Sequence, residues 1–369
     1  MPSFDFGAFK DPALAKGLVG LVGDLAQQVP GDEPIRLMEV CGTHTMSIAR
    51  SGLRSLMPER IELLSGPGCP VCVTADRDID ALIALARMPQ ATIATFGDMV
   101  RVPGSTSSLQ REAAAGARVQ VVYSLIDALA YAQANEDEQV IFAGVGFETT
   151  TPTIAMGIKR AEALGLENFS VFVANKNMPH ALEALVSDPQ LKVNGLLLPG
   201  HVSTIIGPEP YRFLARDHGI PGVIAGFDAV DILQGIAMLL GQLAQGTAQI
   251  QTAYARAVME QGNPVACAVI DEVFETCDAD WRGLGVIAHS GYRLKPRFAR
   301  FDAVARFDPQ PEPTREHAGC SCGDILRAAK TPAQCALFGT ACTPENPLGP
   351  CMVSSEGSCA AWYQYHGVS

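Results

Sequence analysis

From residue 320 to its end, this chain of 369 residues carries six cysteines interleaved with glycine and proline. They are Cys320, Cys322, Cys335, Cys342, Cys351 and Cys359. A segment of this composition cannot build an ordinary hydrophobic core, whereas a soft metal centre bound by thiolates would hold its loops together. No histidine lies between Cys320 and Cys359, so we expect ligands that are all sulfur.

All-thiolate coordination fits either a [4Fe–4S] cluster or a structural zinc ion. Structural zinc usually comes with paired C-x₂₋₄-C knuckles. The only close pair in this segment is the C-x-C of Cys320 and Cys322. The wide later spacings therefore favour a cluster. A set of buried free thiols is the alternative that needs no metal.

A C-x-x-C pair lies near the N-terminus, in the stretch G-P-G-C-P-V-C at 66–72. Cys69 and Cys72 follow a predicted strand and precede a helix, as in thioredoxin-like redox pairs. The helix N-terminus would lower a thiol pKa there, and Pro70 would restrict the backbone between the sulfurs. The pair is predicted to be redox-active or to bind metal transiently; half a metal knuckle and a purely structural role are the alternatives.

Another cysteine lies in M-E-V-C-G-T-H-T at 38–45. Cys41 is placed where a strand ends and a helix begins, which is the usual position of ligands in open α/β sheets. His44 follows three residues later, so its imidazole could reach the same site. A small core residue is the alternative role for Cys41.

Two weaker candidates complete the set. Glu148 stands among several hydroxyls at a helix start, in G-F-E-T-T-T-P-T at 146–153, where the hydroxyls could simply cap the helix. His201 follows a buried strand in L-P-G-H-V-S and could equally be a structural histidine. The glycine turns match neither phosphate-loop nor dinucleotide-binding patterns, so nucleotide binding is poorly supported.

Short apolar runs alternate with longer helical patterns, which indicates βαβ units and parallel sheets with helices on both faces. Strands are predicted in two series, at 35–40, 61–64, 91–96 and 119–123, and at 140–145, 169–174, 195–198 and 223–225. Two further strands are expected at 266–270 and 285–289.

The predicted fold class is α/β, with two Rossmann-like domains and a small cysteine-rich C-terminal iron–sulfur domain. The two α/β domains are expected to join near the polar run at 135–139. The predicted ranges are 1–30 for a helical segment, 31–137 and 138–263 for the α/β domains, 264–319 for a return segment and linker, and 320–369 for the iron–sulfur domain.

Charge and apolar patterning narrow the possible partners. The net charge of −12 argues against nucleic acid, because phosphate binding needs a basic face. The longest apolar stretches, such as 232–243, are too short to span a bilayer, and the N-terminus lacks a signal-peptide pattern. We therefore expect a cytoplasmic protein without membrane contact, whose cysteines serve as ligands or redox groups rather than disulfide staples.

Taken together, the motifs resemble those of the HypD family of hydrogenase maturation proteins. The stretches that carry the resemblance run through nearly the whole chain. They are M-E-V-C-G-T-H-T, G-P-G-C-P-V-C-V, T-F-G-D-M-V-R-V-P-G, G-F-E-T-T-T-P-T, P-G-H-V-S, V-I-A-G-F-D, W-R-G-L-G-V-I and M-V-S-S-E-G-S-C-A-A-W-Y.

The resemblance implies a scaffold on which the Fe(CN)₂CO group of [NiFe]-hydrogenases is assembled, rather than a turnover enzyme. It implies two partners, a small HypC-type chaperone and a HypE-type protein that delivers cyanide. By likeness, Cys41 would be an iron ligand shared with the chaperone, His44 would lie near that iron, and Cys69 and Cys72 would form the redox dithiol. The implied ligands of a [4Fe–4S] cluster are Cys322, Cys335, Cys342 and Cys359.

Two other interpretations of the same cysteines remain. One is a self-contained thiol–disulfide oxidoreductase that pairs a cluster with a dithiol, which would act on a disulfide substrate. The other is a zinc-bound scaffold that only recruits partners. The oxidoreductase would lack the infrared bands of bound cyanide and carbon monoxide that the assembly scaffold should show. The zinc scaffold would contain no acid-labile sulfide.

Overall fold

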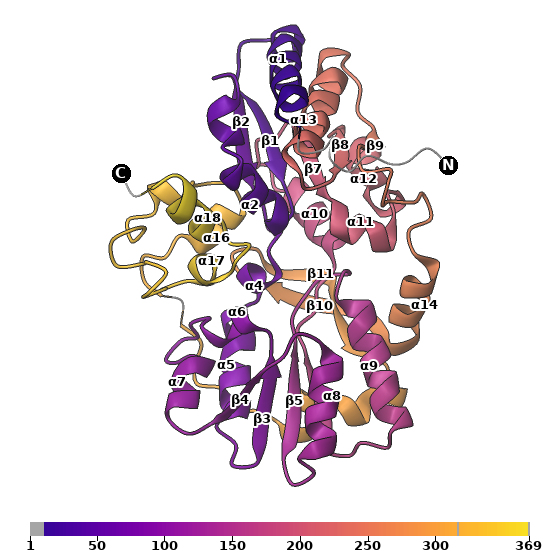
Figure 1. Cartoon of the computed structure of the whole chain (residues 1–369), viewed down its shortest axis with the longest axis vertical. Helices are drawn as coiled ribbons and strands as arrows, with labels where there is room; N and C mark the ends of the chain where they lie inside the picture. Colours follow the sequence, from indigo (N-terminus) through magenta and orange to yellow (C-terminus); the bar gives the residue numbers. More distant parts are fainter. Residues whose placement is uncertain (1–10, 316, 368–369) are drawn as a thin grey trace.

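The computed structural model describes residues 11–315 and 317–367. It confirms the α/β class: two parallel sheets lie one above the other, and the cysteine-rich tail packs against one side of them (Figure 1). All eight strands of the two predicted series are present, each within one or two residues of its expected bounds. In the described residues, no helix has the length and apolarity needed to cross a membrane.

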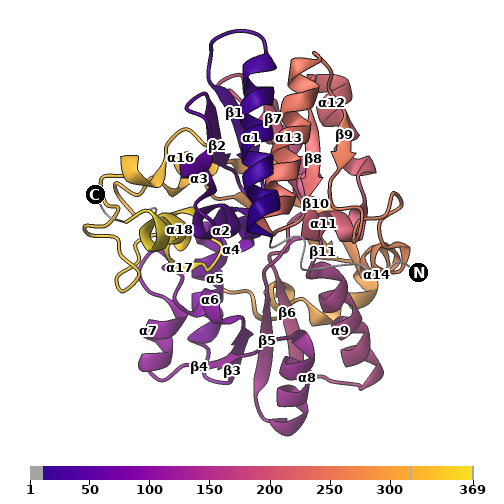
Figure 2. The same ribbon diagram turned by 45° about the horizontal axis from the view of Figure 1, so that its top comes forward.

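The first sheet has five parallel strands in the order β2-β1-β7-β8-β9. Their bounds are β1 Ile35–Glu39, β2 Ile61–Ser65, β7 Gly195–Pro199, β8 Gly222–Ala225 and β9 Ile250–Thr252. Helices α1 (Pro12–Gln28) and α13 (Ala229–Ala244) lie side by side over one face (Figure 2). The other face packs against α10 (Met178–Val186) and α12 (Arg212–His218).

The second sheet has four parallel strands in the order β4-β3-β5-β6. Their bounds are β3 Ala91–Thr95, β4 Arg118–Val121, β5 Gln139–Gly144 and β6 Phe169–Val173. One face is covered by α5 (Asp76–Ala86) and α7 (Leu109–Ala114), and the other by α8 (Leu125–Ala134) and α9 (Thr151–Ala163). Strands buried on both faces explain the continuous apolar runs in the sequence.

The expectation that each half of the chain builds its own sheet is wrong. β1 and β2 share a sheet with β7 and β8 of the second predicted series and with β9, which was not predicted. β3 and β4 share the other sheet with β5 and β6. The chain leaves the first sheet after β2 and returns to it at β7. The alternation of apolar runs and helical patterns is a local property of the sequence. Which strands become neighbours depends on packing between segments far apart in the chain, and the alternation does not encode this.

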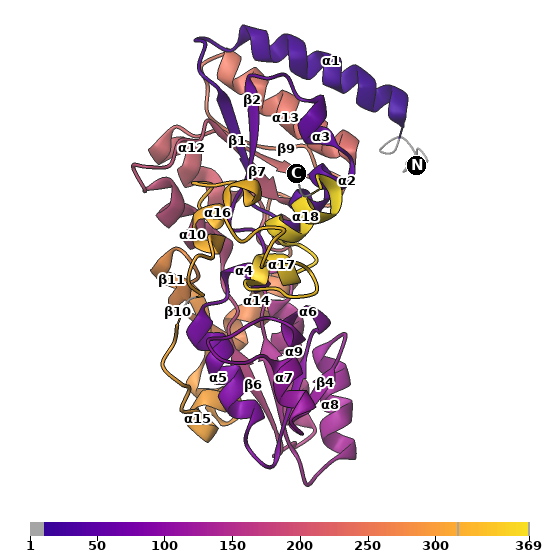
Figure 3. The ribbon, with the colours of Figure 1, turned by 90° about the vertical axis from the view of Figure 1, so that its left-hand side faces the viewer.

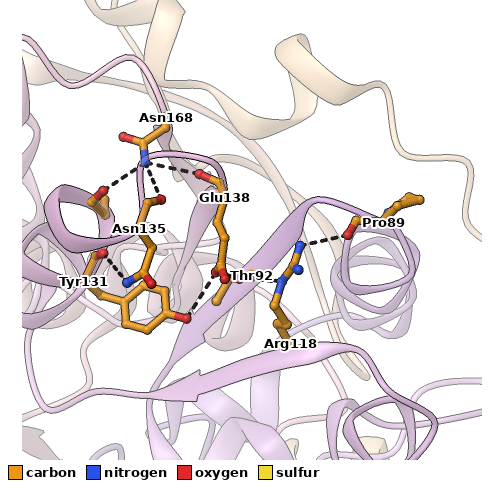
Figure 4. A network of polar contacts seen from close by, with 8 residues as sticks. Pro89, Thr92, Arg118, Tyr131, Asn135, Glu138 and Asn168 are labelled. Atoms are coloured by element: carbon orange, nitrogen blue, oxygen red, sulfur yellow. Dashed lines mark hydrogen bonds and ion pairs between the residues drawn. The ribbon is translucent and has the colours of Figure 1, made fainter.

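The polar run at 135–139 is likewise not a joint between domains. The side-chain amide of Asn168 donates to the carbonyl oxygens of Ala132, Asn135 and Glu138, at 2.9, 3.1 and 3.1 Å. Glu138 also accepts from the Tyr131 hydroxyl at 3.1 Å, and Thr92 on the neighbouring strand bonds to it as well (Figure 4). These bonds fix the run as a turn inside the second α/β unit.

An antiparallel hairpin lies between the two sheets, formed by β10 (Phe274–Trp281) and β11 (Gly285–Leu294) (Figure 1). The predicted strand at 285–289 is therefore confirmed. The one expected at 266–270 is wrong, because these residues lie in helix α14 (Pro264–Val273). Asn263 caps that helix by accepting from the Ala266 amide at 3.1 Å. The strand prediction failed because a run of only five residues is too short for its periodicity to distinguish a strand from a buried helix.

The tail forms only short helices, namely α16 (Cys322–Leu326), α17 (Pro350–Val353) and α18 (Ser358–Tyr365). α18 packs against α2 (Gly42–Arg50), which follows β1, and α17 packs against α4 (Pro70–Val73), which follows β2 (Figure 3). The remaining short helices are α3 (Leu53–Leu56), α6 (Gly97–Val100), α11 (Gly200–Ile206) and α15 (Ala303–Phe307), with 3₁₀ turns at Glu209–Tyr211, Pro296–Phe301 and Pro332–Gln334.

The loops after β1 and β2 touch through their backbones. The Gly42 amide donates to the Gly68 carbonyl at 2.9 Å. A Cβ atom on Gly68 would lie 2.2 Å from the Cys41 nitrogen and 2.4 Å from its Cα, so only glycine permits this approach.

We expect Gly68→Ala to separate these loops and to lower the free energy of unfolding by about 1–3 kcal/mol, as over-packed sites do. The matched control is Gly23→Ala in α1, where an added Cβ meets no atom within 4 Å. Alanine has less conformational entropy to lose on folding than glycine, so this change should stabilise the protein by about 0.5–1 kcal/mol. Denaturant unfolding measures both. Equal stability of Gly68→Ala and the parent would contradict the close packing.

Candidate functional site

Cys41 lies between β1 and α2, at the N-cap position of that helix, as the sequence predicts. Its amide donates to Glu39 Oε2 at 3.1 Å, and the residue is 7% exposed. Burial, reinforced by the Glu356 carboxylate, raises the pKa of Cys41 to about 12, whereas the amides of Thr43 and His44 at the helix start oppose this. The thiol is therefore neutral at pH 7. A metal that binds the sulfur would displace the proton, which is released to water.

Cys69 and Cys72 are joined by a disulfide, with their Cα atoms 5.2 Å apart. Pro70 begins α4 between them, and the Cys72 amide donates to Cys69 Sγ at 3.1 Å. Both residues are buried. The backbone contact between Gly68 and the Cys41 loop places the disulfide beside Cys41, so the structure brings these two predicted groups together.

A segment of the tail closes over both groups. Ser354 Oγ lies 3.3 Å from Cys69 Sγ and, since the disulfide sulfur has no proton, the hydroxyl is the donor. Asp98, after β3, accepts from the Ser355 hydroxyl and amide, both at 2.8 Å. Glu356 accepts from Thr43 Oγ1 at 2.7 Å. Ser354 to Glu356 thus connect the disulfide, the Cys41 helix and the second sheet.

His44 points away from these contacts, toward the loop after β8. Its Nε2 lies 2.9 Å from the Gly226 carbonyl oxygen and 3.3 Å from that of Ala225, which assigns the proton to Nε2. Nδ1 is buried, and no residue in the described part of the chain forms a hydrogen bond to it. Burial lowers the pKa of His44 to about 4, so the ring is neutral at pH 7 and keeps a lone pair on Nδ1.

His201 begins α11 and is brought close to His44 by an aromatic ring. The Phe227 ring stacks on His201 with centroids 3.9 Å apart, and its centroid is 5.0 Å from that of His44. Burial lowers the pKa of His201 as well. The two histidines predicted from separate motifs therefore belong to one cluster at the carboxyl ends of β1, β7 and β8.

Glu148 lies at the carboxyl end of β5, in the other sheet. Its Oε1 accepts from the Met178 amide at 2.9 Å, so it caps α10, and Oε2 is buried without a hydrogen-bond partner among the described residues. Burial raises the pKa of Glu148 to about 7. The neighbouring hydroxyls do not cap their own helix: that of Thr151, for example, donates to the Phe147 carbonyl at 2.8 Å. The structure shows no contact of Glu148 with Cys41.

Four further residues belong to the site but were not predicted from the sequence: Glu39, Asp98, Ser354 and Glu356. Glu39 is buried, accepts from Thr45 Oγ1 at 2.6 Å, and has its pKa raised to about 7 by burial. The signal for Glu39 was its spacing of two residues from Cys41, which places both side chains on one side of an extended segment. The other three lie in motifs whose partners are distant in sequence.

Five of the six tail cysteines line one small, apolar cavity, together with Ile325, Leu337, Phe338, Gly349 and Met352. They are Cys320, Cys322, Cys335, Cys342 and Cys359. Cys351 is fully buried and does not line it. Gly349 forms part of the wall, since a Cβ there would lie 2.6 Å from Cys322 Sγ.

These thiols fit a cluster as donors: all are sulfur, they converge on one apolar space, and the wall is cut back to glycine beside a sulfur atom. In the described part of the chain, no three Cys, His, Asp or Glu side chains form a ready-made site for a single metal ion.

Comparison with known proteins agrees with the motifs. Residues 15–366 match the HypD model described as the hydrogenase formation hypA family. The chain is 46% identical over 367 residues to the hydrogenase maturation factor HypD of Rhodobacter capsulatus, covering 98% of this chain and 97% of the relative. It is 44% identical over 335 residues to HypD of Escherichia coli K12, with 90% of each chain covered. The chain therefore belongs to the HypD family of hydrogenase maturation factors.

Proposed function

We propose that this maturation factor is the scaffold on which the Fe(CN)₂CO group of [NiFe]-hydrogenases is assembled, together with a HypC-type chaperone and a HypE-type cyanide donor. The observation that carries the proposal is the contact between the Gly42 amide and the Gly68 carbonyl. It places one isolated thiol, suited to hold iron, beside a disulfide that can accept electrons.

In this proposal Cys41 is the protein's own ligand to the cargo iron. Low-spin iron carrying cyanide and carbon monoxide is soft, so a thiolate suits it. The amides of Thr43 and His44 would stabilise the thiolate once the proton is lost, because they lie at the positive end of a helix. Neutral His44 adds no charge and keeps an Nδ1 lone pair, but its ring is bonded to the loop after β8, so its nearness to the iron stays a prediction.

The Cys69–Cys72 pair is the redox group of the proposal. Opening the disulfide breaks the S–S bond, consumes two electrons and two protons, and yields two thiols. The reverse reaction would return two electrons to chemistry at Cys41. Because both cysteines are buried under the tail, an external disulfide substrate has little access, which disfavours the self-contained oxidoreductase.

Cys322, Cys335, Cys342 and Cys359 are the proposed ligands of a [4Fe–4S] cluster, which would supply one-electron chemistry when bound. Cys320 lines the same cavity and is the one alternative ligand there. The chain's own contribution is to hold these thiols around an apolar space and to link them, through Cys351 to Ser354, to the disulfide.

We expect Cys359→Ser to lose most of the iron and acid-labile sulfide of the anaerobically prepared protein, because it removes a cavity thiol. Cys351→Ala is the matched control: it is a tail cysteine outside the cavity and should retain about four iron and four sulfide per chain. Zinc without sulfide in the parent, or equal losses in both variants, would refute the assignment.

We expect the double variant Cys69→Ser/Cys72→Ser, co-produced with the chaperone, to lack the infrared bands of cyanide and carbon monoxide while keeping its iron and sulfide. The control is Cys267→Ser, a half-buried cysteine in α14 outside the disulfide. Full-intensity bands in the double variant would show that the dithiol is not required for assembly.

A further inference from the structure

A cleft with a volume of about 1290 Å³ lies between the tail and the second α/β unit. Its walls come from the starts of α5 and α7, the loop after α6, the hairpin turn after Trp281, residues 314, 315 and 317, and the tail. Six arginines line it: Arg77, Arg101, Arg111, Arg282, Arg315 and Arg327.

This arginine cleft is unusual in a chain whose net charge is −12. Four acids line it: Asp76 pairs with Arg282, Asp280 with Arg77 and Asp324 with Arg327, and Glu345 is the fourth. The six arginines therefore exceed the acids of the lining by two. Arg101, Arg111 and Arg315 are exposed and form no ion pair with any residue that the structure describes. The cleft therefore keeps positive charge that the protein itself does not compensate.

Arg282 is held rigidly at the wall. It is 10% exposed, donates to the Thr74 carbonyl at 3.1 Å and pairs with Asp76. Its Nη2 is buried with no hydrogen-bond partner in the described residues. Arg282 therefore shapes this wall of the cleft, while Asp76 compensates its charge.

The cleft also reaches the thiol cavity. Cys320, Cys322 and Gly349 line both spaces, so the cleft is the cavity's opening toward the arginines. The cleft exceeds the 300–1,000 Å³ typical of small-molecule pockets. Its arginines stand on six separate segments rather than converging on one point, which suits a protein surface better than a single small anion.

We propose that the arginine cleft is the docking surface for an acidic one-electron carrier protein, a small protein of the ferredoxin or flavodoxin class. The inference rests on the proposed function, because it supplies the reductant that opening the Cys69–Cys72 disulfide requires. Two carriers, each giving up one electron, and two protons from solvent balance the two thiols formed. Charge complementarity selects the carrier and speeds its encounter.

The test measures binding of an acidic [2Fe–2S] ferredoxin to the full, iron- and sulfide-containing chain by titration calorimetry. We expect the triple variant Arg101→Glu/Arg111→Glu/Arg315→Glu to raise Kd at least about tenfold at low salt, and added salt to weaken the parent complex. The matched control, Arg160→Glu/Arg216→Glu/Arg300→Glu, changes the net charge equally at exposed arginines that do not line the cleft. It should shift Kd by less than about threefold.

Further arms make the result decisive. A milder triple variant, with Gln at 101, 111 and 315, should give an intermediate Kd, and a basic c-type cytochrome should not bind. Equal losses in the cleft and control variants, or no ferredoxin binding by the parent, would overturn the proposal. So would stoichiometric, arginine-dependent binding of tripolyphosphate in place of the carrier. Iron and sulfide are assayed on the same samples, so failure of the cluster assignment and failure of docking are seen separately.

Discussion

The site depends on a single close approach between two loops that are separate in the sequence. The loop after β1 carries Cys41, and the loop after β2 carries the Cys69–Cys72 disulfide. Because β1 and β2 are adjacent and parallel in register, their carboxyl ends lie at one edge of the sheet. Gly68 then allows backbone to meet backbone, with the Gly42 amide bonded to the Gly68 carbonyl. A larger residue would push the isolated thiol away from the disulfide.

Burial sets the chemical state of the groups around this contact. Cys41, Glu39 and His44 are all buried, and in each case burial shifts the pKa toward the neutral form. The site thus contains a protonated thiol and a histidine with a free lone pair. In the proposed function, a soft, multiply ligated iron would displace the proton of this thiol on binding.

The tail couples this site to the cavity of thiols. Met352 and Cys359 line the cavity. Between them in the chain, Ser354 contacts the disulfide and Glu356 contacts the Cys41 helix. A change in the redox state of the disulfide, or of the proposed cluster, could therefore alter the contacts of this same short segment. The arginine cleft meets the same cavity at Cys320, Cys322 and Gly349, so in the proposed scheme electrons from a carrier would enter beside the cluster ligands.

The sequence by itself determined the strands, the parallel α/β class and the groups of cysteines, because alternation of apolar runs and residue spacing are local properties. It also determined the family, through motifs whose order is fixed along the chain. The tertiary structure alone decided that β1, with β2 on its other side, pairs with β7 rather than with β3, and that 266–270 is helical. It also decided that Cys351 stands outside the cavity shared by the other tail cysteines, and that Ser354 and Glu356 complete the site. The strand pairing and the contacts of Ser354 and Glu356 join residues far apart in the sequence, and such contacts leave no periodic trace in the chain.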